Sequence, residues 1–344
     1  MNDPINGISR PRVVAVEEHF RTPELEAVLE GPEKLFSRAL GESLGDIGDK
    51  RIADMDEAGI DVQVLSSAAP HVQWMEAAEA VDISRRVNDR LADAVMTHPD
   101  RFAGLATLAT PAPAEAAREL ERCVRDLDLR GAMIYGHTDG RFLDDQFFWP
   151  ILEAAEALDV PLYLHPSYAP KAVVDAYYSG LPGHFGTMLS TGMMGWHYEV
   201  AMHSMRMVLG GVFKRFPRLQ LIIGHCGEAL PFFLDRSIKV LNRASPEMSQ
   251  HLREVYPANF YITTAGFYYD APMRCALEVT PIDRVLFATD YPYASAVEGA
   301  EWIRSTVTLD DTQRRMVMHA NSDRLFGLDR APQNAAATAA GVNR

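Results

Sequence analysis

The chain has 344 residues, of which 47% are hydrophobic and 23% charged, and its formal net charge is −14 at pH 7. This composition is typical of a soluble globular protein, and the length suffices for one large domain or two smaller ones. The negative charge, together with the absence of a dense lysine and arginine run, disfavours a nucleic acid or an anionic membrane as the partner.

The cysteines and the N-terminal sequence predict a cytoplasmic location. Cys123, Cys226 and Cys275 lie far apart without a CxxC pair, which favours a reduced chain over a disulfide scaffold. The first residues, MNDPINGISRPR, contain no apolar signal segment. No apolar run approaches the ~20 residues that a membrane span requires.

Short apolar segments, most of them nearly continuous, recur along the chain and predict the strands of a parallel sheet covered on both faces. There are eight, at residues 13–19, 62–68, 102–108, 131–137, 160–166, 219–226, 260–266 and 284–292. Helical patterns fill the gaps between them. Alternating strands and helices predict an α/β fold, a (β/α)8 TIM barrel forming a single domain over residues 1–328, with a doubly wound open sheet as the alternative.

Two of the helical patterns are detailed enough to predict caps and buried faces. Over residues 110–127, Thr110 is expected to cap the helix and Pro111 to lie in its first turn. Over residues 195–217 the pattern predicts one helix. Its expected buried stripe is Ala201, Met205, Val208 and Val212.

Two segments interrupt the simple repeat of strand and helix. Residues 20–50 and 167–194 are long and rich in Gly, Pro and Tyr, and they follow the first and fifth predicted strands. Because a barrel carries its active-site loops at the carboxyl ends of the strands, we expect both insertions to lie near the site, with surface decoration as the alternative. Residues 329–344 are low in complexity and are expected to form a flexible tail.

The first predicted strand ends in Glu17, Glu18 and His19. In a regular strand, side chains two residues apart share a face, so Glu17 and His19 are expected on the apolar face that carries Val13. A carboxylate and an imidazole on an otherwise apolar face are either a costly burial or a functional site.

Polar residues also lie at the ends of three other predicted strands. His165 is at the end of the fifth strand, His225 at the end of the sixth and Asp290 at the end of the eighth. The carboxyl ends of barrel strands converge on one rim, where Glu, His and Asp side chains would suit Zn²⁺, Mn²⁺ or Fe²⁺ and leave a position open for catalysis. Taken singly, each residue also has a structural explanation, since a strand-end histidine is often only hydrogen-bonded and Asp290 could begin a turn.

Several motifs occur in order along residues 13–328: EEHF, RIADMDEAGIDVQVLS, HPDRFAGLATL, LHP, VFKRFPRLQLIIGHCGEALPFFLDR, ATDYP and ANSDRLFGL. Through them the chain resembles the amidohydrolase superfamily, in the branch of metal-dependent, non-oxidative aromatic acid decarboxylases. That branch includes the resorcylate, dihydroxybenzoate and carboxyvanillate decarboxylases and is related to aminocarboxymuconate semialdehyde decarboxylase. Glu-x-His in the first strand, rather than His-x-His, favours the benzoate-type enzymes.

The resemblance implies one divalent transition metal ion, Zn or Mn. The implied ligands are Glu17, His19, His165 and Asp290. It also implies that Asp290, His225 and Glu228 act in catalysis, with Glu228 orienting the His225 ring from a helix that starts just after the strand. Arg236 would reach a neighbouring subunit's site in a homodimer or homotetramer, and Arg51 would be a second arginine for the substrate carboxylate.

The activity implied is decarboxylation of an ortho-hydroxylated, dihydroxybenzoate-type acid to the phenol and CO2, with Asp290 protonating the ring carbon. One alternative is a hydrolase of the same superfamily that acts on a lactone or related ring-cleavage intermediate, with Asp290 as general base. Another is a barrel that binds without catalysis. His71, Ser167 and Tyr168 differ from residues frequent in the family, so the sequence leaves the ring substituents open.

Overall fold

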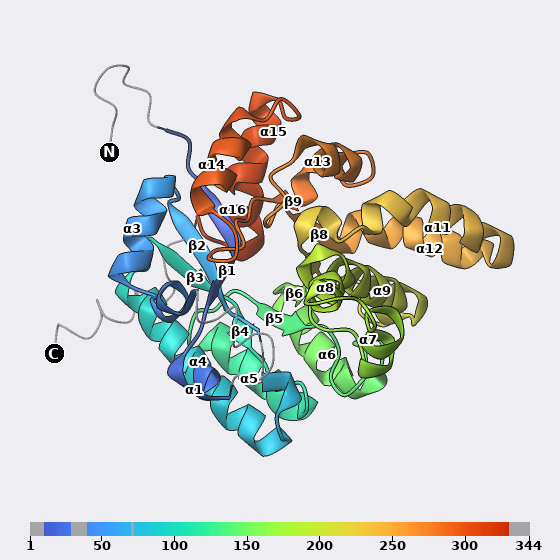
Figure 1. The fold of residues 1–344 in the computed structure, drawn as a ribbon, viewed down its shortest axis with the longest axis horizontal. Coiled ribbons are helices and arrows are strands. Elements are labelled where there is room, and N and C mark those ends of the chain that lie inside the picture. Colours follow the sequence, from blue (N-terminus) through green and yellow to red (C-terminus); the bar gives the residue numbers. More distant parts are fainter. Residues whose placement is uncertain (1–9, 29–39, 70–71, 330–344) are drawn as a thin grey trace.

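Parallel strands form the inner layer of the fold, and helices surround them (Figure 1). The computed structural model describes residues 10–28, 40–69 and 72–329. The strands are β1 (Val14–Phe20), β2 (Val62–Ser67), β3 (Phe102–Gly104), β4 (Ala106–Thr107), β5 (Ala132–Tyr135), β6 (Leu162–His165), β7 (Leu221–Ile223), β8 (Phe260–Thr263) and β9 (Val285–Leu286). Each coincides with a predicted strand, β3 and β4 sharing one.

Hydrogen bonds close the sheets β1–β3 and β4–β9 into one barrel. β3 and β4 are halves of a single strand interrupted at Leu105, whose N–H donates to the Leu65 carbonyl at 2.8 Å. The last strand returns to the first through a parallel bridge between Val16 and Ala288, and Val16 N–H donates to the Phe287 carbonyl at 3.0 Å. This closure confirms the predicted (β/α)8 barrel and excludes the open sheet.

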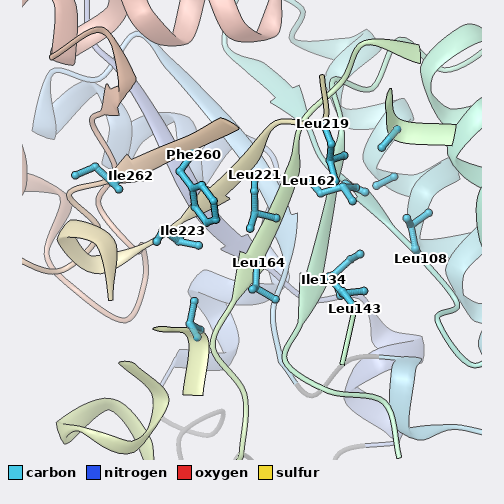
Figure 2. Close-up of a cluster of buried hydrophobic side chains, with 14 of the residues drawn as sticks. Leu108, Ile134, Leu143, Leu162, Leu164, Leu219, Leu221, Ile223, Phe260 and Ile262 are labelled. Atoms are coloured by element: carbon cyan, nitrogen blue, oxygen red, sulfur yellow. The ribbon is translucent and has the colours of Figure 1, made fainter. Parts of the chain in front are cut away.

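Side chains that alternate along the strands divide the core into two layers. The layer inside the barrel includes Val14, Val16, Val64, Met133, Tyr163, Ile222 and Leu286. The layer between strands and helices includes Ile134, Leu162, Leu164, Leu221, Ile223, Phe260 and Ile262 (Figure 2). Strands buried on both faces need apolar residues at nearly every position, which explains the continuous apolar runs in the sequence.

The larger helices of the outer layer follow the strands in chain order. They are α3 (Asp49–Ala58), α4 (Ala77–Thr97), α5 (Pro113–Arg125), α6 (Trp149–Leu158), α9 (Gly195–Leu209), α11 (Leu230–Ala244), α12 (Pro246–Asn259), α13 (Asp270–Leu277), α14 (Ala296–Ser305) and α16 (Asn321–Phe326). Among the described residues, no helix combines the length and apolar character needed to cross a membrane.

The helix predicted over residues 110–127 forms as α5, but its cap prediction was wrong. Pro113 lies in the first turn, and the N-cap is Ala112. The hydroxyl of Thr110 instead lies 2.7 Å from that of Thr138, a contact between loops that local sequence does not reveal.

The helix predicted over residues 195–217 is divided into α9 and α10 (Val212–Arg215). The break falls at Gly211, whose φ of 82° is left-handed and favours glycine. Of the predicted stripe, Val208 and Val212 are buried, whereas Ala201 and Met205 are half-buried.

Both predicted insertions follow strand ends. The first contains α1 (Pro23–Ala27), but residues 29–39 lie outside the described residues. The second contains α7 (Lys171–Tyr177), α8 (Phe185–Met188) and the π-helical turn η3 (Leu189–Met193), which leads into α9 (Figure 1). Apart from Asp329, the predicted tail also lies outside the described residues.

Candidate metal centre

A β-bulge at the end of β1 determines which side chains face the barrel interior. The pairing of β1 with β2 shifts between Val16 and Glu18, and Glu17 has a φ of 69°. The extra residue lets Glu17 follow Val16 onto the interior face, and His19 points the same way. Glu17 and His19 do share a face, as predicted, but Val13 packs in the outer layer, so the regular alternation assumed for this strand was wrong.

Glu18 consequently lies outside the cluster that Glu17 and His19 join. Its carboxylate accepts hydrogen bonds from Thr289 N at 2.8 Å, from the Thr289 hydroxyl at 2.6 Å and from Gln63 Nε2 at 3.1 Å. Burial raises the pKa of Glu18 to about 8, although the Thr289 bonds oppose the shift. Glu18 therefore ties β1 to β2 and to the segment after β9.

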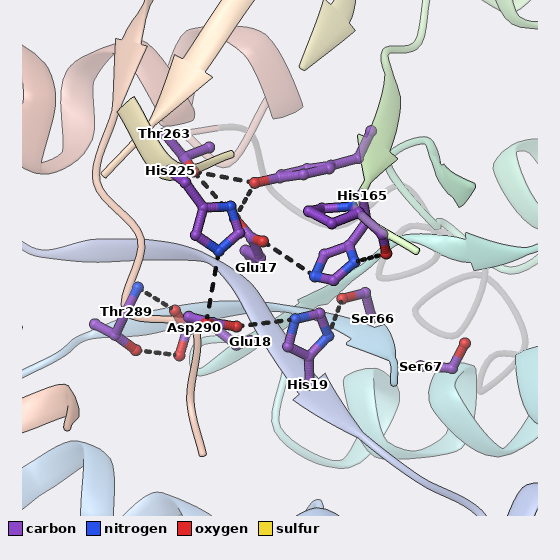
Figure 3. Close-up of polar contacts among 12 residues, drawn as sticks. Glu17, Glu18, His19, Ser66, Ser67, His165, His225, Thr263, Thr289 and Asp290 are labelled. Carbon is purple, nitrogen blue, oxygen red and sulfur yellow. Dashed lines mark hydrogen bonds and ion pairs between the residues drawn. The ribbon is translucent and has the colours of Figure 1, made fainter. Parts of the chain in front are cut away.

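Four side chains from the ends of β1, β6 and β9 meet at this rim (Figure 3). They are Glu17, His19, His165 and Asp290, and one potential ligand atom of each lies within 4.8 Å of the others. His19 Nε2 is 3.3 Å from Asp290 Oδ1. His165 Nε2 is 3.2 Å from Glu17 Oε1. The structure thus brings together the four residues predicted as metal ligands.

The unsatisfied atoms of this cluster fit a cation. Glu17 Oε1 and His19 Nε2 are buried and have no hydrogen-bond partner among the described residues. Glu17 Oε2, in contrast, accepts from the Thr263 hydroxyl at 3.1 Å and from Tyr163. Buried polar atoms without partners are costly, and two imidazoles with two carboxylates suit a first-row divalent metal.

Groups outside the cluster contact the Nδ1 atoms of both histidines and leave their Nε2 atoms directed at the cluster. His165 Nδ1 lies 2.8 Å from the Pro166 carbonyl, which can only accept, so Nδ1 carries a proton and Nε2 is the nitrogen directed at the cluster. His19 Nδ1 lies 3.3 Å from the Ser66 hydroxyl and 3.4 Å from that of Tyr135. Burial lowers the pKa of His19, which favours the neutral ring that a metal binds.

His225 and Glu228 form the predicted pair beside these four residues. His225 Nδ1 is 2.6 Å from Glu228 Oε1, and His225 Nε2 is 3.8 Å from Asp290 Oδ2. Burial opposes the charge on the His225 ring, but the carboxylates of Glu228 and Glu17 outweigh it and hold the pKa of His225 well above its usual value. Burial likewise disfavours ionised Glu228, yet His225 and then His197 bring the pKa of Glu228 down to about 2.

The backbone that presents the His225–Glu228 pair differs from the prediction. We expected a helix immediately after the strand, but a 3-10 turn, η4 (His225–Gly227), follows β7, and α11 begins only at Leu230. The φ angles of His225 and Glu228 are 46° and 55°. Together with Glu17 and Asp290, at 69° and 60°, these residues hold the left-handed conformation that L-residues rarely adopt and that concentrates at functional sites.

Gly224 provides the close approach on which this arrangement depends. A Cβ atom at this position would lie 3.0 Å from Glu17 Oε2, 3.1 Å from Glu228 Oε1 and 3.1 Å from the Tyr163 hydroxyl. A side chain here would therefore crowd two of the site carboxylates at once, which explains a glycine between β7 and His225.

The two predicted substrate-binding arginines lie apart from this cluster. Arg51 is fully buried in α3, and its guanidinium donates to the carbonyls of His19, Ser43 and Asp46 and to Gln63 Oε1. It therefore supports the backbone of β1, and these contacts give no support to the predicted direct contact with substrate. Arg236 is exposed on α11.

Three residues near the site carried no signal in the sequence analysis. His197 Nδ1, in the first turn of α9, is 2.6 Å from Glu228 Oε2. The Phe267 ring centroid is 5.6 Å from that of His225, and the Tyr293 centroid is 5.6 Å from that of His19. The position of Tyr293, three residues after Asp290 in the sequence, could have indicated that it lies near the site.

Three residues, His71, Ser167 and Tyr168, differ from those frequent in the family. Ser167 is buried, and the ring centroid of Tyr168 lies 6.1 Å from that of Trp74 and 6.2 Å from that of Trp196. His71 lies outside the described residues.

Comparisons with known proteins agree with this geometry. An amidohydrolase family model matches residues 18–328. The chain is 34% identical over 330 residues to the gamma-resorcylate decarboxylase of Polaromonas sp. (strain JS666), covering 92% of this chain and 99% of that protein.

Solved structures give the same result. A dihydroxybenzoic acid decarboxylase from Polaromonas sp. JS666, with bound manganese and the inhibitor 2-nitroresorcinol, matches with a TM-score of 0.84 and 32% identity over 93% of this chain and 98% of that one. The 5-carboxyvanillate decarboxylase from Sphingomonas paucimobilis matches with a TM-score of 0.83 and 33% identity, over 92% of this chain and 99% of that one. The chain therefore belongs to the amidohydrolase family.

Proposed function

We propose that this protein is a metal-dependent decarboxylase that releases CO2 from a hydroxylated aromatic acid of the dihydroxybenzoate type. The observation that carries the proposal is the four-residue cluster of Glu17, His19, His165 and Asp290, with the His225–Glu228 pair directly beside it. The similar proteins described above are decarboxylases of such acids, which supports this chemistry over hydrolysis.

These four residues would hold one divalent ion. Manganese is favoured because the Polaromonas neighbour carries it, and zinc suits the same donor set. When bound, the ion supplies positive charge that polarises the oxygen atoms of the substrate.

The remaining chemistry concerns one proton. Conversion of an aryl carboxylate and a proton to an arene and CO2 consumes a proton, and loss of CO2 before protonation would leave an unstable aryl anion. Asp290 is the proposed donor to the ring carbon. His225 Nε2 lies 3.8 Å from Asp290 Oδ2 and can return a proton to it.

We also infer that the protein works as a homo-oligomer. Large apolar side chains are exposed along α8, η3, α9 and α11, including Phe185, Met188, Met193, Met202 and Phe232. Apolar surface of this kind marks interaction sites, and the proposed occupant is a second copy of the chain. Arg236, exposed on the same α11 as Phe232, would then reach the partner's site.

The direct test is product analysis with the manganese-loaded protein. Dihydroxybenzoates and carboxyvanillate are supplied in turn, and CO2 and the corresponding phenol are quantified. We expect stoichiometric CO2 and phenol. Formation of a ring-opened acid from a lactone, without CO2 from any of the aromatic acids, would support the hydrolase instead.

A further inference from the structure

The carboxylate of Glu228 is held by two imidazoles, one on each oxygen. His225 Nδ1 lies 2.6 Å from Oε1, and His197 Nδ1 lies 2.6 Å from Oε2. Glu228 is fully buried, whereas the His197 side chain is 12% exposed. The centroids of the two rings are 4.9 Å apart. The arrangement extends from Asp290 through His225 and Glu228 to a residue near the surface.

The other nitrogen of His197 fixes its ring. His197 Nε2 lies 3.0 Å from the carbonyl of Gly192 in η3. A carbonyl can only accept, so Nε2 carries a proton, and a second proton must lie between Nδ1 and Glu228 Oε2. The ring therefore cannot turn over without losing both bonds. The Phe267 ring, with its centroid 5.1 Å away, packs against it.

This contact limits how Glu228 can act on His225. If Oε2 had no partner, the carboxylate could rotate and present either oxygen, or exchange one imidazole for water. With Oε2 held by His197, Oε1 stays on His225 Nδ1, and the opposite nitrogen of His225 stays directed toward Asp290 Oδ2.

We propose that His197 is a positioning residue for proton transfer, which clamps Glu228 and thereby fixes the His225 ring against Asp290. His197 lies in α9, directly after the insertion of residues 167–194, so the clamp also connects that insertion to the site. The kinetic consequence rests on the proposed decarboxylase function, but the clamp itself does not.

Two substitutions separate the clamp from a general packing role. In His197→Leu no donor remains for Glu228 Oε2, whereas in His197→Asn the side-chain amide can replace Nδ1. We expect kcat to fall roughly tenfold or more in His197→Leu with little change in KM, as is typical for loss of an outer partner. His197→Asn should recover most of that loss. His251→Leu is the matched control, because His251 is a half-buried histidine of α12 whose Nε2 has no hydrogen-bond partner among the described residues, and this variant should behave as wild type.

A spectroscopic readout is independent of turnover. In the protein loaded with diamagnetic Zn²⁺ and labelled with ¹⁵N-histidine, the Nδ1 proton of His225 should give a downfield NMR signal because of its short bond to Glu228. We expect this signal to broaden or move in His197→Leu and to persist in His197→Asn. If the wild type decarboxylates no aromatic acid, the proposed function fails, and the NMR comparison still decides the clamp.

Three results would overturn the inference. One is an unchanged kcat and an unchanged His225 signal in His197→Leu. Another is equal impairment of the Asn and Leu variants at equal metal content and equal melting temperature. The third is a second equivalent of metal per chain that His197→Leu removes, because His197, His225 and Glu228 would then be ligands and not a hydrogen-bonded clamp.

Discussion

His165 Nε2 and Glu17 Oε1 lie 3.2 Å apart, joining the ends of β6 and β1 across the barrel rim. The Glu17 side chain is fully buried, and that of His165 is nearly so. Since the Nδ1 proton of His165 is committed to Pro166, Nε2 is the atom of this ring that faces the carboxylate. A metal ion between Nε2 and Glu17 Oε1 would satisfy both buried atoms at once.

Glu17→Gln should therefore weaken metal binding. The amide removes one negative charge and places either a poorer oxygen donor or an N–H where Glu17 Oε1 is now. We expect the affinity for Mn²⁺ to fall by at least about tenfold. Metal content after equilibrium dialysis measures this, and a variant that retains one equivalent under wild-type conditions would remove Glu17 from the ligand set.

Glu18→Gln, at the adjacent position, should change how the stability of the fold depends on pH. Burial raises the pKa of Glu18 to about 8, so near neutral pH the folded metal-free protein holds this acid largely protonated, and glutamine mimics that form. Between about pH 4.5 and 8, the folded chain therefore keeps a proton on Glu18 that the unfolded chain has lost. The stability contribution of Glu18 is complete below this range and declines as the pH rises through it.

The measurement is thermal unfolding of the metal-free wild type and Glu18→Gln as a function of pH. The stability of the variant relative to wild type should rise with pH by up to about 1.4 kcal/mol per pH unit. A difference that is constant from pH 5 to 8 would show that Glu18 ionises at its ordinary pKa.

Asp290→Asn should separate metal binding from catalysis. Asparagine keeps an oxygen near the site but cannot deliver a proton to the ring carbon. We expect kcat for dihydroxybenzoates to fall by roughly 10²- to 10⁴-fold while metal remains bound. Near-full activity would remove Asp290 from the role of acid, and loss of metal would require the comparison at saturating Mn²⁺.

Arg51→Met should affect stability and leave substrate affinity unchanged. The substitution removes the donors to the His19, Ser43 and Asp46 carbonyls from a fully buried position. We expect the free energy of unfolding to fall by about 3 kcal/mol, since a single unsatisfied buried acceptor costs about 1–3 kcal/mol. Calorimetry and steady-state kinetics check this, and a raised KM with normal stability would restore Arg51 as a substrate ligand.

Arg236→Ala tests the shared site that we infer for the oligomer. Because Arg236 is exposed on α11, its loss should leave folding and metal content intact while lowering activity. Light scattering gives the oligomeric state in parallel. A fully active monomer, or an active Arg236→Ala oligomer, would contradict the shared site.

The barrel and most of its site were predictable because they follow from short-range pattern. Strands covered on both faces must be apolar throughout, and the carboxyl ends of such strands converge, so His165, His225 and Asp290 could be placed together. The bulge at Glu17 was not predictable, because it depends on register with β2, where Glu18 pairs with Leu65.

The other features that the sequence did not reveal also depend on long-range contacts. Arg51 resembles a substrate ligand in sequence, and only the fold brings it beneath the carbonyl of His19. His197 follows a long insertion, and nothing within α9 indicates that its first turn will meet Glu228 after β7. Side chains whose partners lie in other loops carry no periodic signal.

Anomalous diffraction at the manganese edge from crystals of the loaded protein tests the central claim most directly. It should show one peak coordinated by Glu17, His19, His165 and Asp290, with His225 outside the coordination sphere. Absence of a peak between these four side chains at one metal equivalent per chain, or a peak at another set of residues, would contradict the proposed centre.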